Sequence, residues 1–97
     1  MSKTVHDQIA ERIARKFHTE YKQNKGIDIV TPRRVVEVET KSSTLSQGIN
    51  QVVHSQKPRY IAVNKQNIDN ALDATEGTGI GVMNQMGNVV KKAGRTK

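Results

Sequence analysis

Four charged residues in the first half of the chain are placed so that they could hold a metal ion and activate water: Asp28, Glu37, Glu39 and Lys41. In a strand, side chains alternate between two faces, so the last three would share one face of a strand over 34–41. A hairpin with the apolar run around Asp28 would bring its carboxylate beside that face. Clustered carboxylates repel one another unless a cation lies among them, and Mg²⁺ prefers oxygen ligands. The same pattern also fits the solvated face of an edge strand.

The spacing of apolar residues predicts an α/β domain with the element order αββαβαββ. A first helix begins near Val5 and ends by Gly26, because apolar residues recur there every four positions. A strand–helix–strand crossover in the middle implies a small mixed sheet flanked by helices. The later elements are expected as strands over 26–31 and 34–41, a helix capped within 42–44 and stopped by Pro58, a strand over 59–63, a short helix from 67 to 77, and strands over 79–83 and 88–90.

Length and charge set the broad class of the protein. With 97 residues we expect one domain over 1–97, with a core over about 4–90 and a basic tail over 91–97. The 16 Lys and Arg against 9 Asp and Glu give a formal charge of +7, which favours a polyanionic partner, nucleic acid first. No apolar run approaches the roughly 20 residues of a membrane span. We therefore expect a cytoplasmic (intracellular) protein that does not use a membrane.

The amino-acid composition also narrows the chemistry. The chain has no cysteine, which excludes disulfides, thiolate metal sites and cysteine nucleophiles. Only 3 aromatic residues are present, so contacts with phosphates are a better expectation than base stacking. Scattered surface charge is the alternative to phosphate binding. The expected contacts are Arg33, Arg34, Lys57, Arg59, Lys91 and Lys92.

The order of elements and the hairpin motif together resemble the minimal core of the PD-(D/E)xK nucleases. That superfamily includes restriction endonucleases and archaeal Holliday-junction resolvases, and the small size is closest to the resolvase-like branch. The resemblance covers about residues 7–83. It implies a restriction-endonuclease-like fold in which Asp28 and Glu37 ligate Mg²⁺, with Mn²⁺ able to substitute. The pair Glu11-Arg12 resembles the Glu-Arg pair of the first helix in that family, where the Glu joins the metal shell.

Two departures from the family motif are visible in the hairpin. The family has Lys two residues after its Glu, whereas this chain has Glu39, and Ile27 stands where the family has Pro. Glu39-Thr40-Lys41 matches the motif in a register shifted by two residues, so both registers remain open. Either one places a Lys and a carboxylate on one strand face. His6 falls within the apolar stripe of the first helix and is interpreted as a packing residue or as part of a frayed terminus.

These observations lead to one expected function and two alternatives. We expect a Mg²⁺-dependent DNA endonuclease that recognises DNA structure more than sequence, with Asp28, Glu37, Glu39 and Lys41 as catalytic residues. A chain of this size has little surface for reading bases, so a homodimer is expected. A catalytically degraded DNA-binding module of the same fold is the first alternative. A basic RNA-binding domain is the second.

Overall fold

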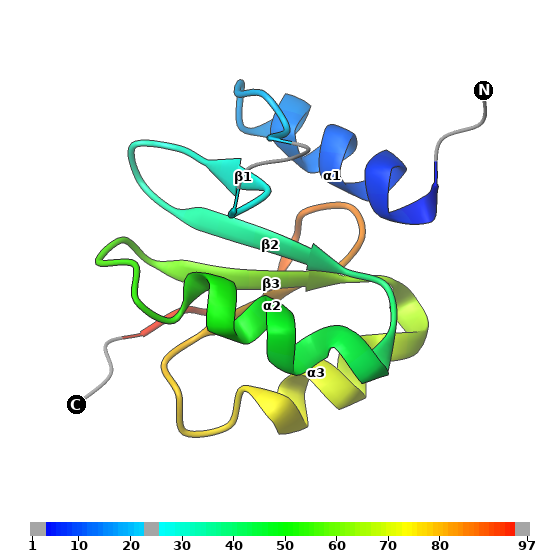
Figure 1. The fold of residues 1–97 in the computed structure, drawn as a ribbon, viewed down its shortest axis with the longest axis vertical. Helices are drawn as coiled ribbons and strands as arrows, with labels where there is room; N and C mark the ends of the chain where they lie inside the picture. Colours follow the sequence, from blue (N-terminus) through cyan, green and yellow to red (C-terminus); the bar gives the residue numbers. More distant parts are fainter. Residues whose placement is uncertain (1–3, 23–25, 95–97) are drawn as a thin grey trace.

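A computed structural model describes residues 4–22 and 26–94 as a five-stranded mixed sheet with helices on both faces (Figure 1). Strand order follows the sequence, from β1 to β5. The first pair of strands is antiparallel, β2, β3 and β4 run parallel, and the last pair is antiparallel. The elements are α1 (Val5–Lys16), β1 (Ile29–Val30), β2 (Val35–Glu39), α2 (Leu45–Val52), β3 (Arg59–Val63), α3 (Ile68–Ala74), β4 (Gly81–Met83) and β5 (Val89–Lys91), with short 3₁₀ turns at Ser42–Thr44 and Lys65–Asn67.

This arrangement confirms the predicted α/β class, element order and mixed sheet. The extent of the elements differs, because the strands are shorter than the apolar runs and α1 ends at Lys16 instead of continuing to Tyr21. His18 adopts a left-handed backbone conformation with φ of 57°, which a helix cannot continue through. Phe17 and Tyr21 still pack against the core beyond the end of the helix. Of the predicted basic tail over 91–97, Lys91 is the last residue of β5, and residues 95–97 lie outside the described residues.

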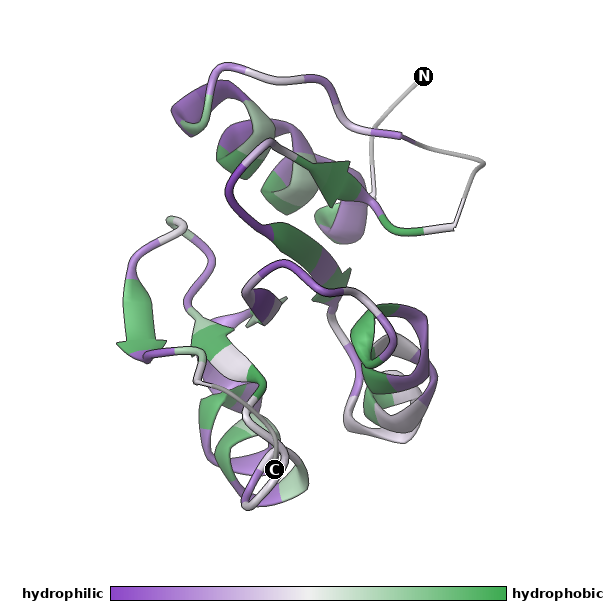
Figure 2. Ribbon diagram, turned by 90° about the vertical axis from the view of Figure 1, so that its left-hand side faces the viewer, coloured by the Kyte–Doolittle hydropathy of each residue, from purple (hydrophilic) through white to green (hydrophobic). Residues whose placement is uncertain are grey.

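Two apolar clusters lie on opposite faces of the sheet. On one face α1 packs Ile9 and Ile13 against Val36 and Val38 of β2. On the other face α2 and α3 cover the second cluster, which includes Ile61. Figure 2 shows hydrophobic strands lying between these helices. All five residues of β3 are buried, as its nearly all-apolar sequence predicted.

The alternation of side chains along β2 decides where its acidic residues lie. Val36 and Val38 face α1, whereas Val35 belongs to the cluster under α2 and α3. Glu37 and Glu39 share the parity of Val35, so they point toward the α2 side, as the period of two predicted. Glu37 is only 7% exposed, so the fold buries a carboxylate in the strand next to the edge of the sheet.

The turn between β1 and β2 is held by one side chain. The Thr31 hydroxyl accepts hydrogen bonds from the backbone N–H groups of Arg33 and Arg34, and it donates to the Arg34 carbonyl. Ile29 pairs with Val36, and Asp28 therefore enters the hairpin opposite Glu37. A local turn thus fixes the register that brings the two acidic residues together.

Candidate active site

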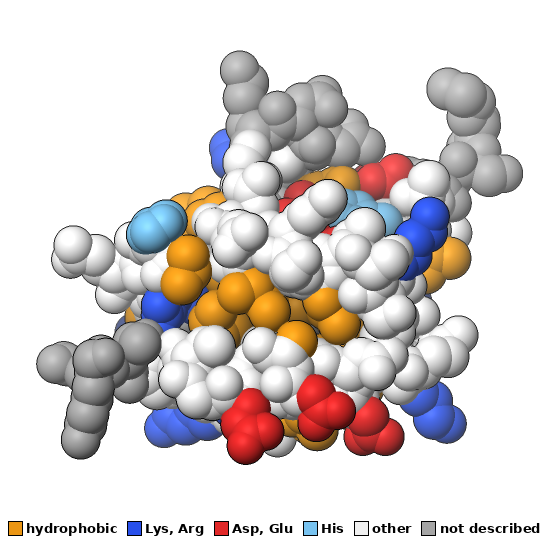
Figure 3. Space-filling view, turned by 60° about the horizontal axis from the view of Figure 1, so that its bottom comes forward, with side chains coloured by type: hydrophobic (Ala, Val, Ile, Leu, Met, Phe, Trp, Pro, Cys, Tyr) orange, Lys and Arg blue, Asp and Glu red, His pale blue; other side chains and the backbone are white. Residues whose placement is uncertain are grey.

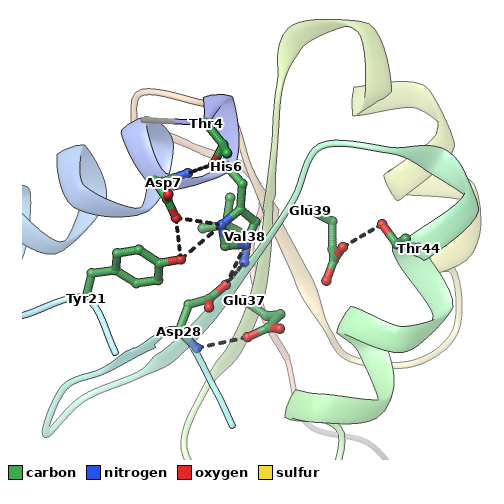
Figure 4. A network of polar contacts seen from close by, with 9 residues as sticks. All are labelled: Thr4, His6, Asp7, Tyr21, Asp28, Glu37, Val38, Glu39 and Thr44. Carbon is green, nitrogen blue, oxygen red and sulfur yellow. Dashed lines mark hydrogen bonds and ion pairs between the residues drawn. The ribbon is translucent and has the colours of Figure 1, made fainter. Parts of the chain in front are cut away.

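Asp28 and β2 exchange two hydrogen bonds at the open end of the hairpin (Figure 4). The backbone N–H of Asp28 donates to Glu37 Oε1 at 2.9 Å, and the backbone N–H of Val38 donates to Asp28 Oδ2 at 3.0 Å. Both carboxylates are buried, with Asp28 6% exposed. The predicted convergence of Asp28 and Glu37 in the hairpin is therefore confirmed.

The electrostatic environment of Glu37 favours its neutral form in the absence of a cation. Burial raises the pKa of Glu37 to about 8, and the negative charge of Asp28 acts in the same direction. The hydrogen bond from the Asp28 N–H opposes this shift only in part. A positive ion beside the two carboxylates would relieve both the repulsion and the cost of burying charge.

His6 lies against Asp28, and sequence reasoning missed this contact. Its Nε2 lies 3.2 Å from Asp28 Oδ2, and this hydrogen bond raises the pKa of His6 to about 9. The Nδ1 atom lies 3.1 Å from the Tyr21 hydroxyl, which donates to Asp7. A histidine within a buried helical stripe needs polar partners, and that requirement is the signal that could have identified it.

Glu39 extends from the end of β2 toward α2. Its Oε1 accepts a hydrogen bond from the Thr44 hydroxyl at 2.6 Å, and burial raises the pKa of its carboxyl group. The side chain passes directly over Gly48, where an added Cβ would lie 2.6 Å from Glu39 Cγ. The absence of a side chain at Gly48 therefore makes room for Glu39.

The structure places the remaining predicted site residues outside this pair of carboxylates. Lys41 lies two residues beyond β2, is exposed, and keeps an extended backbone with φ of −132° and ψ of 137°. Glu11 lies on α1 and lines a surface hollow that includes Arg15 and Tyr21. His6, five residues earlier on α1, contacts Asp28 instead. The third metal ligand predicted at Glu11 stays a prediction.

The donor atoms fit a Mg²⁺ ion that keeps most of its water. Asp28 and Glu37 each engage one oxygen in the hairpin, and within residues 4–22 and 26–94 their other oxygens make no hydrogen bond or ion pair. No group of three or more His, Asp or Glu side chains in that part of the chain is arranged to hold a metal ion. Mg²⁺ is commonly held by one or two carboxylates, waters and substrate phosphates, so two carboxylates are a sufficient protein contribution.

The six basic residues predicted to contact phosphates gather at one end of the sheet. Arg33 and Arg34 lie in the turn before β2, and the Lys57 side chain donates to the Thr31 carbonyl in that turn. Arg59 pairs with Val35 at the start of β3. Lys91 and Lys92 reach the same end because β5 runs antiparallel to β4. A hollow of about 590 Å³ lies at this end, lined by Lys57, Arg59, Gly94 and their neighbours.

These basic side chains differ in how free they are to meet a ligand. Arg59 is buried and donates to the carbonyls of Val53 and Thr78, and Lys91 donates to Thr75. The Arg34 guanidinium stacks 4.6 Å from the centre of the Phe17 ring. Arg33 and Lys92 are exposed. The basic end therefore contains two kinds of side chain. Some, such as Arg59 and Lys91, hold loops to the sheet, and others, such as Arg33 and Lys92, are exposed.

Comparison with known proteins returns no relative: no family model, no curated protein and no solved structure matches this chain. Among the described residues, no helix has the length and apolar character needed to cross a membrane.

Replacing Gly48 by Ala tests the contact between α2 and Glu39. In the wild-type background we expect a loss of about 1–3 kcal/mol, because the new Cβ displaces Glu39. In a Glu39→Ala background the same change should stabilise by up to about 1 kcal/mol, since Ala is favoured over Gly in a helix. Chemical denaturation of the four proteins measures both effects. An equal effect of Gly48→Ala in both backgrounds would show that Glu39 does not occupy this space.

Proposed function

We propose that this protein is a Mg²⁺-dependent DNA endonuclease built on a restriction-endonuclease-like fold. The observation that carries the proposal is the buried pair of carboxylates, Asp28 and Glu37, held together in the hairpin. Burial and the charge of Asp28 raise the pKa of Glu37 to about 8 even though His6 lies beside Asp28, so a further cation bound by the two carboxylates would favour their charged forms. The order of helices and strands and the PD-(D/E)xK-like motif support the same proposal.

Each residue around the pair has a part in the proposed reaction. Asp28 and Glu37 hold the ion, and His6 fixes the Asp28 carboxylate through its contact at 3.2 Å. Bound Mg²⁺ would polarise the scissile phosphate and lower the pKa of the attacking water. Lys41 or Glu39 orients that water from the end of β2. The Glu39 carboxylate already accepts a hydrogen bond from the Thr44 hydroxyl. This contact supports Glu37, and not Glu39, as the metal ligand.

The basic end of the sheet supplies the proposed contacts with the DNA backbone. Glu37 lies two residues from Val35, or roughly 7 Å along the strand, and the basic turn lies just before Val35. A DNA backbone crossing this end would therefore reach the carboxylates within about one or two phosphate spacings. Asp28 lies just before β1, whereas the turn with Arg33 and Arg34 lies just after it. These two arginines would therefore hold DNA and not the metal.

The structural features also bear on the alternatives. One observation favours a module that binds DNA without cutting it. Position 39 carries Glu where the family has Lys, and the nearby Lys41 lies beyond the end of β2. RNA binding would use the same basic end but would need no carboxylate pair. The homodimer stays a prediction.

Conservative replacement of either carboxylate tests the site. Asp28→Asn and Glu37→Gln each retain an oxygen that can accept the backbone hydrogen bond of the hairpin, so the fold should survive. We expect each variant to lose at least about 100-fold in metal-dependent cleavage, because a ligand of the ion is gone, while DNA binding stays near wild type. The measurement is cleavage of duplex, single-stranded, flap and four-way-junction DNA with and without Mg²⁺ or Mn²⁺.

Glu20→Gln is the matched control, since it neutralises an exposed acid beyond the end of α1 and should leave cleavage unchanged. Full metal-dependent cleavage by Asp28→Asn or Glu37→Gln would show that the active site lies elsewhere. Wild-type protein that binds DNA without cutting any of these substrates would establish the binding module instead.

The salt dependence of binding tests the basic end. If about 4–6 phosphates are neutralised, the slope of log affinity against log salt should be about −4 to −5 on duplex DNA. Arg33→Ala should reduce the steepness by about 1, because it removes one exposed contact, whereas Arg33→Lys keeps the charge and the slope. Fluorescence anisotropy between about 50 and 200 mM salt measures both. An Arg33→Ala slope equal to wild type would remove Arg33 from the interface.

A further inference from the structure

An apolar groove runs between α2 and α3, on the face of the sheet opposite α1 (Figure 3). Its volume is about 460 Å³, and its lining includes Leu45 and Ile49 of α2 and Ala74 of α3. Leu45 and Ile49 are one turn apart, so they form a continuous apolar floor. Polar residues close the rim, among them Ser46, Asn70 and Asp73.

The two borders of the groove differ in charge. Asp69, Asp73 and Glu76 are exposed along α3 and just beyond its end, whereas α2 carries no charged residue. None of these three acids forms an ion pair within the described part of the chain. No Lys or Arg occurs from position 66 to position 90. In a chain with a formal charge of +7, this border is a local region of negative charge.

Local charge decides what can approach the groove. At physiological ionic strength charges are screened beyond about 8 Å, so an occupant senses mainly the charges next to the groove, which are the three acids and, at the C-terminal end of α3, the Lys91 ammonium group bound to Thr75. Unpaired carboxylates repel a nucleic acid and attract a cationic partner. An apolar floor between two helices accepts the apolar face of a third helix. These features together specify an amphipathic helix with basic residues along one side.

This chain does not supply such a helix from its own described residues. The basic helix is α1, with Arg12, Arg15 and Lys16, but its apolar stripe is buried in the core of its own sheet. The Lys16 side chain is also engaged with Gly87 and Asn88. A second copy therefore offers no free apolar and basic face of this kind.

We propose that the groove between α2 and α3 docks a basic amphipathic helix of another protein. Apolar side chains of that helix lie on Leu45 and Ile49, and its Lys or Arg side chains pair with Asp69, Asp73 and Glu76. Asp69 and Asp73 are one turn apart on α3, and Glu76 follows two residues after the helix ends. A partner with basic residues at the same spacing would meet all three. This proposal is independent of the nuclease function.

A designed peptide tests the proposal with the intact chain. The probe is a synthetic amphipathic helix with leucines on one face, lysines along one border and glutamines elsewhere. We expect it to shift the backbone amide resonances of α2 and α3 in a ¹⁵N NMR titration. The triple variant Asp69→Asn, Asp73→Asn, Glu76→Gln should weaken its binding at least about 10-fold. Glu20→Gln, an exposed acid beyond the end of α1, should leave the affinity unchanged.

A second peptide, with glutamates in place of the lysines, should not bind. Equal binding of both peptides would overturn the role of the acidic border, as would an unchanged affinity of the triple variant. Amide shifts outside α2 and α3 would overturn the location. Shifts of the groove amides on raising the protein concentration without peptide, or on adding DNA, would assign the groove to a second copy or to nucleic acid and overturn the proposal.

Discussion

The reciprocal hydrogen bonds between Asp28 and β2 are the interaction on which the candidate site depends. The Asp28 N–H binds the Glu37 carboxylate, and the Val38 N–H binds the Asp28 carboxylate. Acidic side chains are unfavourable partners inside a protein, because burial disfavours their charge. Here the register of the hairpin fixes where the two acidic side chains lie. A shift of β2 by one residue would turn its apolar side chains out of the core, so this register is strongly favoured. The apolar face of β2 thus forces the carboxylates together, and their repulsion makes the site suitable for a cation.

Charged side chains of the same sign gather in several regions of this small molecule. The carboxylate pair lies at the open end of the β1–β2 hairpin, the six predicted phosphate contacts lie at the other end, and exposed acids lie along α3 and just beyond its end. Arg59 and Lys91 use their charges to hold loop carbonyls, so part of the basic excess maintains the fold. Arg33 and Lys92 remain exposed at this end of the sheet, and Arg12, Arg15 and Lys16 are exposed on α1. A chain of 97 residues can therefore present surfaces of opposite sign to different partners.

The sequence predicted much of this arrangement because the signals were local. The period of two in β2 placed Glu37 and Glu39 on one face, and the short turn at Thr31 implied the hairpin that brings Asp28 to Glu37. The contact of His6 with Asp28 was missed, because it joins residues 22 positions apart through the docking of α1 on the sheet. The end of α1 was placed too late, because the apolar spacing continues to Tyr21 while His18 adopts a left-handed conformation. Packing against Gly48 likewise depends on a tertiary approach that spacing along the chain does not encode.

The side-chain pKa of Glu37, measured with and without Mg²⁺, tests the central claim most directly. Carbon NMR of the labelled carboxyl group can follow this one residue through a pH titration. Without divalent cations the account predicts a pKa of about 8, because the carboxyl group is buried beside Asp28. Saturating Mg²⁺ should lower that pKa below about 5, since the bound ion favours the charged form. A pKa near its ordinary value of 4.5 without the ion, or a raised pKa that Mg²⁺ leaves unchanged, would contradict the assignment of Asp28 and Glu37 as a cation site.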